Sequence, residues 1–337
     1  MLARILLCSL LLVSPAFAAR PAAKPARPTG TVVVVNQKSD SITLIDLARM
    51  EAYAHVPVVG GPHEAAVSPD GRTVAVSNYA KPGQPQRALS LIALPGGQTL
   101  KTIDLSPYQM PHDLRWLDPE HVVCTAERDS ALLVVNVGSG SVERVFRTGA
   151  RGSHMLALAK DHRRLYCSNL FSGSVSAFDF ATGERLAIIP TGKECEGVGV
   201  SPDGRWVWAG NRAEDTISII DTDSLKVVKR ITSPGFPYRV QFTPDGKHAL
   251  IPHAMSSRLM VCDVARQDTV RSIALGLAQV PDPATTGVFP HPSGRWAFVT
   301  VRNDDSMLVL DLESGATLAR VAVQSSPDGL CWSPVRR

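Results

Sequence analysis

The stretch Gly197–Gly235, GVGVSPDGRWVWAGNRAEDTISIIDTDSLKVVKRITSPG, decides the fold. It contains four short runs rich in β-branched and aromatic residues, which favour strands, and they are separated by turn sequences such as Ser201–Gly204 and Asp221–Ser224. A four-stranded unit of this size cannot bury both of its faces alone. The stretch therefore predicts neighbouring copies of itself.

Seven copies are found along the chain. The Ser-Pro-Asp-Gly type of turn recurs at Ser68–Gly71, Ser201–Gly204 and Thr243–Gly246, with weaker versions in the other copies. The residues five places before the turns recur every 42–49 positions, and they are His63, His112, His154, Glu196, Tyr238, Thr286 and Asp328. A period near 40 residues with four strands per copy indicates a propeller. We predict an all-β fold, a single seven-bladed β-propeller with four-stranded antiparallel blades.

The two ends of the propeller sequence complement each other. The first copy, Thr31–Val58, lacks a first strand, whereas the final segment, Gly329–Trp332, contains only a first strand. Together they complete one blade, so that the ring closes and no sheet edge is left open. The predicted propeller therefore extends over residues 31–337, with its N- and C-terminal strands in one blade.

The N-terminal residues predict export. Residues 1–18 contain the short apolar run Ile5–Val13 and the small-x-small pattern Ala16-Phe17-Ala18, which are typical of a secretory signal peptide. Residues 19–30 form a Pro-rich, basic leader. The run Ile5–Val13 is too short to span a membrane, and we predict no transmembrane segment elsewhere. The expected location is the periplasm or the extracellular medium.

The repeat sequence resembles a known family. The turn is followed by strands such as Thr73–Asn78 (TVAVSN), Trp206–Asn211 (WVWAGN) and Thr216–Asp221 (TISIID). These are similar to the YVTN-repeat β-propellers, the YncE-like proteins, over about residues 31–335. The resemblance implies the fold. It adds DNA binding to the candidate functions and, through seven-bladed lactonases of related repeat type, hydrolysis, although one fold serves many functions.

Composition and motifs exclude several classes. The formal net charge is only +4, and the loop charges are of mixed sign, whereas a nucleic-acid binder should have a segregated basic stripe. The chain contains no CxxCH, HExxH, GxSxG or phosphate-loop motif, which argues against a haem-c carrier, a thermolysin-like protease and a serine hydrolase. Five cysteines follow the signal segment, and we expect buried thiols instead of a disulfide framework.

The seven residues from His63 to Asp328 that lie five places before the turns form the first column of the repeat. This column is polar, whereas the next columns on the same strand face are apolar. In a propeller the first strands line the central channel, so this column should form a ring at one mouth. His63, His112 and His154, followed by Glu196, suit a zinc, copper or iron ion. A calcium alternative uses the oxygen ligands Glu64, Asp113, Glu196 and Asp328. The other interpretation is a wet polar rim whose histidines bond to water and loop carbonyls.

Further ring and loop residues suit an organic ligand. Guanidinium groups bind anions, and the residues that we expect near this mouth are Tyr238, Arg239, Arg212, Thr286, Asp328 and His253, with Arg302 nearby. His253 stands out because asparagine ends the second strand in four of the other copies. These residues predict a ligand site on the channel-mouth face.

Three functions remain open. The first is a periplasmic or secreted binding or accessory protein, a monomer, that holds a small ligand, a metal ion or a protein partner on the histidine-rich face. The second is a metal-dependent hydrolase or lactonase, or a metal oxidoreductase. The third is a scaffold that binds DNA or an envelope polymer. A bound metal ion together with turnover of a substrate would favour the enzyme. DNA binding that weakens steeply with salt would favour the scaffold.

Overall fold

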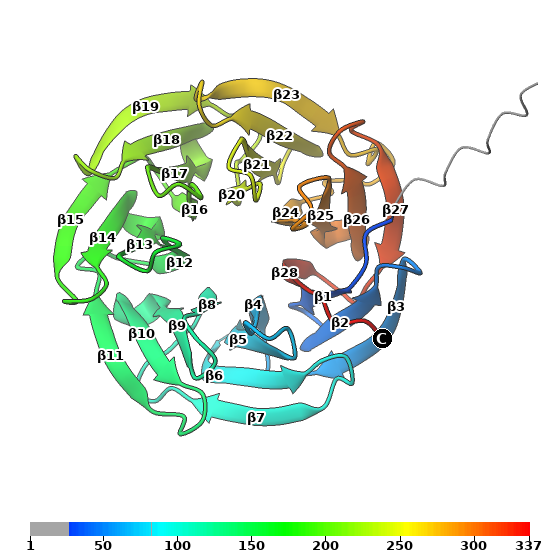
Figure 1. The fold of residues 1–337 in the computed structure, drawn as a ribbon, viewed down its shortest axis with the longest axis horizontal. Helices are drawn as coiled ribbons and strands as arrows, with labels where there is room; N and C mark the ends of the chain where they lie inside the picture. Colours follow the sequence, from blue (N-terminus) through cyan, green and yellow to red (C-terminus); the bar gives the residue numbers. More distant parts are fainter. Residues whose placement is uncertain (1–26, 82) are drawn as a thin grey trace, which may run out of the picture.

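The computed structural model describes residues 27–81 and 83–337. Within this part of the chain, seven four-stranded antiparallel sheets surround a central channel as the blades of a propeller (Figure 1). The predicted all-β, seven-bladed fold is thereby confirmed. The predicted signal peptide and most of the leader lie outside the described residues.

The strands follow the repeat. In blade order they are β28 (Pro327–Ser333), β1 (Thr31–Asn36), β2 (Ser41–Asp46) and β3 (Glu51–Pro57); β4 (Pro62–Val67), β5 (Thr73–Lys81), β6 (Gln84–Ala93) and β7 (Thr99–Asp104); β8 (Leu114–Trp116), β9 (His121–Ala126), β10 (Ala131–Asn136) and β11 (Val142–Arg147); β12 (Ser153–Leu158), β13 (Arg164–Asn169), β14 (Ser174–Asp179) and β15 (Arg185–Pro190); β16 (Cys195–Val200), β17 (Trp206–Asn211), β18 (Thr216–Asp221) and β19 (Lys226–Thr232); β20 (Gln241–Phe242), β21 (His248–His253), β22 (Arg258–Asp263) and β23 (Asp268–Ala274); and β24 (Thr285–Pro290), β25 (Trp296–Val301), β26 (Ser306–Asp311) and β27 (Thr317–Ala322). Short 3-10 turns follow four of the second strands, and they are η1 (Glu127–Asp129), η2 (Leu170–Ser172), η3 (Arg212–Glu214) and η4 (Arg302–Asp304).

The ring is closed by the two ends of the propeller, as predicted. Strand β28 pairs antiparallel with β1, with Val32 opposite Trp332 and Val34 opposite Leu330 (Figure 1). The Trp332 indole nitrogen donates to the Thr29 carbonyl at 2.9 Å. Strand β1 is therefore paired on both sides, which removes an exposed edge.

The hydrophobic core lies between neighbouring blades. In one cluster, Trp208 and Ile219 of the fifth blade pack with Ile251 and Met260 of the sixth. The five cysteines of the described residues are all free and buried, as expected: Cys124, Cys167, Cys195, Cys262 and Cys331. None of the described helices is long and apolar enough to cross a membrane.

The turns between first and second strands define one face of the disc. In Ser201–Gly204 the Ser201 hydroxyl donates to Asp203 at 2.5 Å and accepts from the Trp206 amide at 2.9 Å, and Gly204 has a positive φ of 75°. We call this side the turn face. The first strands begin at the opposite side, which we call the histidine face because His63 and its equivalents lie there.

One hairpin is longer than its equivalents in the other blades. Strands β5 and β6 continue until Lys81 pairs with Gln84. The additional residues therefore extend the sheet at the histidine face.

Candidate functional site

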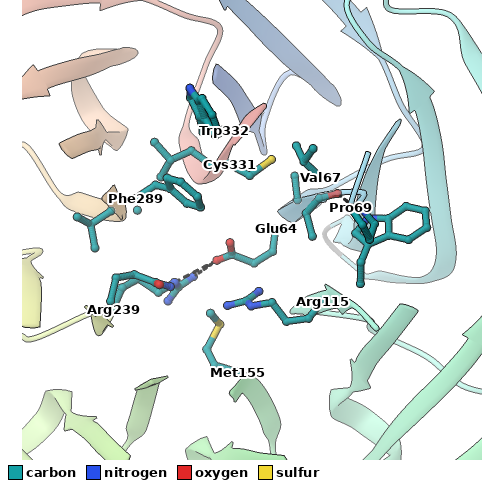
Figure 2. Close-up of a pocket in the computed structure, with 16 residues that line it drawn as sticks. Glu64, Val67, Pro69, Arg115, Met155, Arg239, Phe289, Cys331 and Trp332 are labelled. Carbon is teal, nitrogen blue, oxygen red and sulfur yellow. Dashed lines mark hydrogen bonds and ion pairs between the residues drawn. The ribbon is translucent and has the colours of Figure 1, made fainter. Parts of the chain in front are cut away.

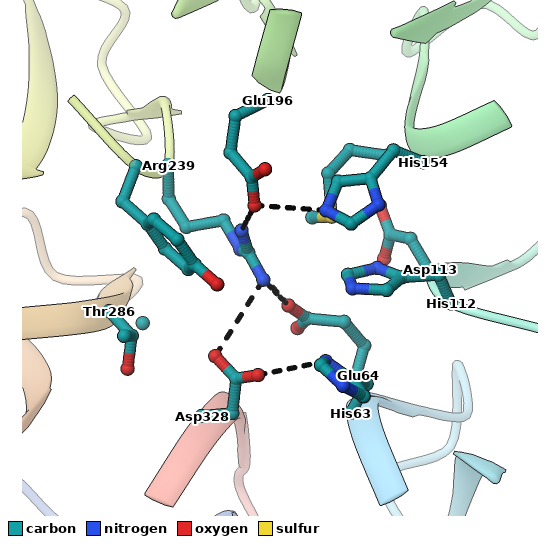
Figure 3. A network of polar contacts seen from close by, with 12 residues as sticks. His63, Glu64, His112, Asp113, His154, Glu196, Arg239, Thr286 and Asp328 are labelled. Carbon is teal, nitrogen blue, oxygen red and sulfur yellow. Dashed lines mark hydrogen bonds and ion pairs between the residues drawn. The ribbon is translucent and has the colours of Figure 1, made fainter. Parts of the chain in front are cut away.

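Residues of the polar column converge at the histidine face (Figure 3). The ring centroids of His63 and His112 are 4.5 Å apart, and those of His112 and His154 are 3.7 Å apart. His154 Nε2 lies 2.9 Å from Glu196 Oε1, and His63 Nδ1 lies 2.8 Å from Asp328 Oδ2. All five side chains are buried. The column residues therefore form a buried polar network at the histidine face.

The other two members of the column differ. Tyr238 belongs to the network, because its hydroxyl lies 3.4 Å from Arg302 Nη2 and its ring lies 4.4 Å from the Arg239 guanidinium carbon. Thr286 instead bonds to Thr300, at 3.1 Å, and to the carbonyl of Pro327. Thr286 is thus part of the strand packing between two blades.

A backbone irregularity adds a second column to the channel. The register of the first two strands shifts between Pro62 and Ala65 and at the equivalent positions of three other blades. Such a bulge re-aims the side chains next to it. It explains how Glu64 joins His63 in the network. Strict alternation along the strand would have turned Glu64 away.

Arg239 is the centre of this second column (Figure 3). Its Nη1 lies 2.6 Å from Glu196 Oε1, and its Nη2 lies 2.7 Å from Glu64 Oε1 and 3.7 Å from Asp328 Oδ1. Glycine at the equivalent position of another blade leaves room, since a Cβ on Gly197 would lie 2.8 Å from Arg239 Cα. One guanidinium thus joins carboxylates from three blades across the channel.

Residues at the ends of five second strands complete the network. Glu127 begins η1 and bonds to His154 Nδ1 at 2.5 Å, and Arg302 begins η4 and lies 2.9 Å from Asp328. Arg212 begins η3 and lies 2.8 Å from Glu196 Oε2. At the same position of other blades, the Gln37 amide nitrogen lies 2.6 Å from His63 Nε2 and the Tyr79 hydroxyl bonds to Glu127 at 2.8 Å.

Sequence reasoning missed Gln37, Tyr79 and Glu127 as site residues. Their shared position in the repeat, one residue after Asn36, Asn78 and Ala126, is the signal that would have found them. Arg212 and Arg302 occupy this same position and were expected near the mouth. Each of these residues contacts a member of the polar column.

Burial and charge pairing set the protonation of the ring. Burial opposes the charge of His154, but Glu196 and Glu127 raise its pKa to about 9. Burial also opposes the charge of Glu196, but His154, Arg239 and Arg212 lower its pKa to about 2. Burial, together with electrostatic repulsion from His154, His63 and Arg239, holds the pKa of His112 well below its usual value. The network therefore contains a charged His154 beside a neutral His112, with ring centroids 3.7 Å apart.

Glu64 is the exception among the acids. Burial raises the pKa of Glu64 to about 7, and the nearby carboxylates of Asp113 and Asp328 also raise it, although Arg239 opposes them. For Asp328, by contrast, burial is overcome by Arg302, His63 and Arg239, which together lower its pKa below its usual range. Glu64 can thus exchange a proton near neutral pH.

The raised pKa of His154 predicts a loss of stability in alkali. The folded pKa of about 9 exceeds the unfolded value near 6.5, so the stabilisation is complete below about pH 6.5 and is lost as the pH rises through 9. We expect the free energy of unfolding, from urea titrations at about pH 7 and about pH 9.5, to fall by at most about 1.4 kcal/mol per pH unit. His154→Gln should show a smaller decrease. An equal decrease in both proteins would contradict this assignment.

The predicted metal ligands contact other side chains of the network. No group of three or more His, Cys, Asp or Glu among residues 27–81 and 83–337 is arranged to hold one ion. His154 and His63 contact carboxylates, and His112 is the neighbour of both. Asp113 accepts from the amides of Leu114 and Leu156. The zinc, copper, iron and calcium assignments remain untested predictions.

His253 takes a different role from the ring. It ends β21, and its Nε2 lies 2.7 Å from the Ser233 hydroxyl. Its carbonyl accepts from Thr285 at 2.6 Å, which joins the sixth and seventh blades. These contacts tie loops and strands together at the histidine face.

His112 differs from every other ring member. Both of its ring nitrogens are buried and lack a hydrogen-bond partner among the described residues. Tyr79 lies edge-on against it, with ring centroids 5.1 Å apart, and against His63 at 4.6 Å. A buried polar group without a partner carries an energetic penalty, so it marks the place where a ligand would contribute a bond.

Comparisons with curated proteins identify related propellers. The chain is 28% identical over 307 residues to the dihydro-heme d1 dehydrogenase of Pseudomonas aeruginosa, a match that covers 84% of this chain and 58% of that protein. It is 27% identical over 165 residues to the seven-bladed beta-propeller protein Rv1057 of Mycobacterium tuberculosis, over 46% of this chain and 40% of that protein. The chain thus spans less than two thirds of the length of these relatives.

Solved structures share the fold. The hydrazine synthase of Kuenenia stuttgartiensis has a TM-score of 0.71 at 19% identity, over 88% of this chain and 99% of that chain. Dihydro-heme d1 dehydrogenase NirN in complex with DHE has a TM-score of 0.67 at 18% identity, over 94% of this chain and 77% of that chain. The model of the YNCE-like beta-propeller family matches residues 109–291, which is more than half of the chain. The chain belongs to the YNCE-like β-propeller family.

Proposed function

We propose that the chain is an exported binding protein that holds a planar, carboxylate-bearing ligand of the tetrapyrrole class on its histidine face. The observation that carries this proposal is His112, whose two buried ring nitrogens have no partner within the described chain. Imidazole nitrogen is a good ligand for the iron of such a compound. The low pKa of His112 keeps the ring neutral, which is the form that coordinates a metal.

The aromatic and cationic side chains near the polar column suit a flat anion. Phe236 and Tyr238 are stacked with centroids 6.4 Å apart, and the Arg212 guanidinium lies 5.1 Å from the Phe236 ring. Arg302 lies over Tyr238 at 5.7 Å, and its buried Nε has no partner within the described chain. Aromatic faces can stack on a macrocycle, and guanidinium groups bind carboxylates.

The ligand class is supported by one relative. The dihydro-heme d1 dehydrogenase of Pseudomonas aeruginosa is named for a tetrapyrrole substrate, and its match covers most of this propeller. Because the match covers only 58% of that enzyme, we propose that this chain binds such a ligand, and we do not propose that it oxidises the ligand. The predicted signal peptide supports export to the periplasm or beyond.

The test is a haemin titration of the chain without its signal segment. We expect saturable binding with a shift of the Soret band. His112→Ala should abolish the shift, and Arg302→Gln should raise Kd about tenfold through a lost charged contact. His55→Ala is the matched control, because His55 lies exposed on the outer strand β3 and should leave binding unchanged.

Two outcomes would count against the proposal. A Soret shift that survives in His112→Ala, with melting temperature unchanged, would remove His112 from the site. Failure of the wild type to bind haemin would reject the tetrapyrrole class. Metal content after incubation with zinc, copper or iron and desalting separates the alternatives, since retained metal without haemin would favour the metal site at His63, His112, His154 and Glu196.

A further inference from the structure

The turn-face half of the central channel is a separate cavity (Figure 2). It has a volume of about 370 Å³ and extends from the Glu64–Arg239 pair toward Pro69, on one of the turns. A second cavity of about 190 Å³ adjoins it, and the two share Arg115 and Gln241. The volume of the first lies within the usual range for small-molecule sites. The ion pair separates this cavity from the histidine face.

Part of the cavity wall is aromatic. Trp116, Phe289 and Trp332 line the cavity, and they come from three different blades; Figure 2 shows Phe289 and Trp332. The Trp116 indole nitrogen donates to the Ala66 carbonyl at 2.9 Å, and that of Trp332 donates to Thr29, also at 2.9 Å. Both indole groups are thereby satisfied by backbone, so their rings present hydrocarbon surface to a ligand.

Arg115 provides an open cationic group in this cavity. Its Nη1 lies 2.5 Å from Asp113 Oδ1 and donates to the Leu114 carbonyl at 2.7 Å. Its Nε and Nη2 make no hydrogen bond to the described residues, and its side chain is 32% exposed. Asp113 is fully buried and also accepts from the Leu114 and Leu156 amides. Arg115 is therefore held by one nitrogen, and the other two remain available.

The remaining polar groups favour an anion beside Arg115. Arg239 is already neutralised by Glu64, Glu196 and Asp328, so it does not compete for a ligand. The Gln241 side chain also lines both cavities and makes no hydrogen bond to residues 27–81 or 83–337. A guanidinium edge together with a carboxamide can bind the two oxygens of a carboxylate.

We propose that the turn-face cavity binds an aromatic monocarboxylate, with its ring against Trp116, Phe289 and Trp332 and its carboxylate at Arg115 and Gln241. This site is distinct from the one on the histidine face. It is reached from the opposite side of the disc, and its ligand needs no contact with His112.

In the experiment, the chain without its signal segment is titrated with 2-naphthoate and with indole-3-acetate, and binding is measured by isothermal titration calorimetry. Saturable one-to-one binding is expected, with Kd below about 1 mM. The neutral analogue 2-naphthalenemethanol should bind at least about tenfold more weakly than 2-naphthoate, because it lacks the charge that pairs with Arg115. This comparison uses only the wild-type protein, so it does not depend on a variant that folds.

The variants locate the site. Arg115→Gln and Gln241→Leu should each raise Kd for 2-naphthoate, the first by about tenfold or more. Arg72→Gln is the control, because Arg72 is exposed on a turn of the same face and does not line the cavity. The proposal is overturned if neither acid binds saturably, if acid and alcohol bind equally, or if both variants retain wild-type affinity.

Discussion

Arg239→Met is expected to destabilise the propeller by about 3–5 kcal/mol, because it leaves buried carboxylates without their shared cation. Arg239 contacts Glu196 at 2.6 Å, Glu64 at 2.7 Å and Asp328 at 3.7 Å, and it is itself only 3% exposed. Total stabilities of domains are typically about 5–15 kcal/mol, so the loss would be a large share. The measurement is the free energy of unfolding from urea titration.

A second substitution tests the cause. Glu64→Gln in the Arg239→Met background removes a buried acid that must otherwise take up a proton on folding, so it should restore part of the lost stability. Arg295→Met is the control, since Arg295 pairs with Asp311 at 3.0 Å but is 40% exposed, and such pairs contribute about 0–1 kcal/mol. Equal losses in Arg239→Met and Arg295→Met would refute a central role for the Arg239 ion pairs.

Deletion of residues 326–337 is expected to leave the chain insoluble or to lower its melting temperature severely. The deletion removes β28, which pairs with β1 and buries Leu330 and Cys331. Burying a large apolar side chain contributes roughly 1.5–3 kcal/mol, and the exposed edge of β1 would invite aggregation. Solubility and thermal unfolding measure the effect.

Two controls separate the effect of losing ring closure from the effect of losing charged side chains. Deletion of Arg336 and Arg337 leaves β28 intact and should change little. Asp328→Asn removes only the carboxylate that contacts His63 and Arg302, and it should cost less than the loss of the strand. A melting temperature unaffected by removing residues 326–337 would show that the ring does not depend on its shared blade.

Repetition explains why the fold could be predicted from the sequence. The turns Ser68–Gly71, Ser201–Gly204 and Thr243–Gly246 require specific residues, and each copy places them at the same distance from its strands. The missing first strand of the first copy and the isolated strand Gly329–Trp332 predicted the shared blade, because an unpaired edge is unfavourable. The polar column from His63 to Asp328 was likewise visible, since its position in each copy is fixed by the repeat.

The partners within the site depended on the tertiary structure. Arg239 and Glu64 are 175 residues apart, and only closure of the ring brings them into contact. A register shift in the first strand re-aims Glu64 into the channel, which strict alternation does not predict. The sequence therefore determined the blades and the polar column by local periodicity. The tertiary structure decided which charges meet, because blades distant in the sequence converge on one axis.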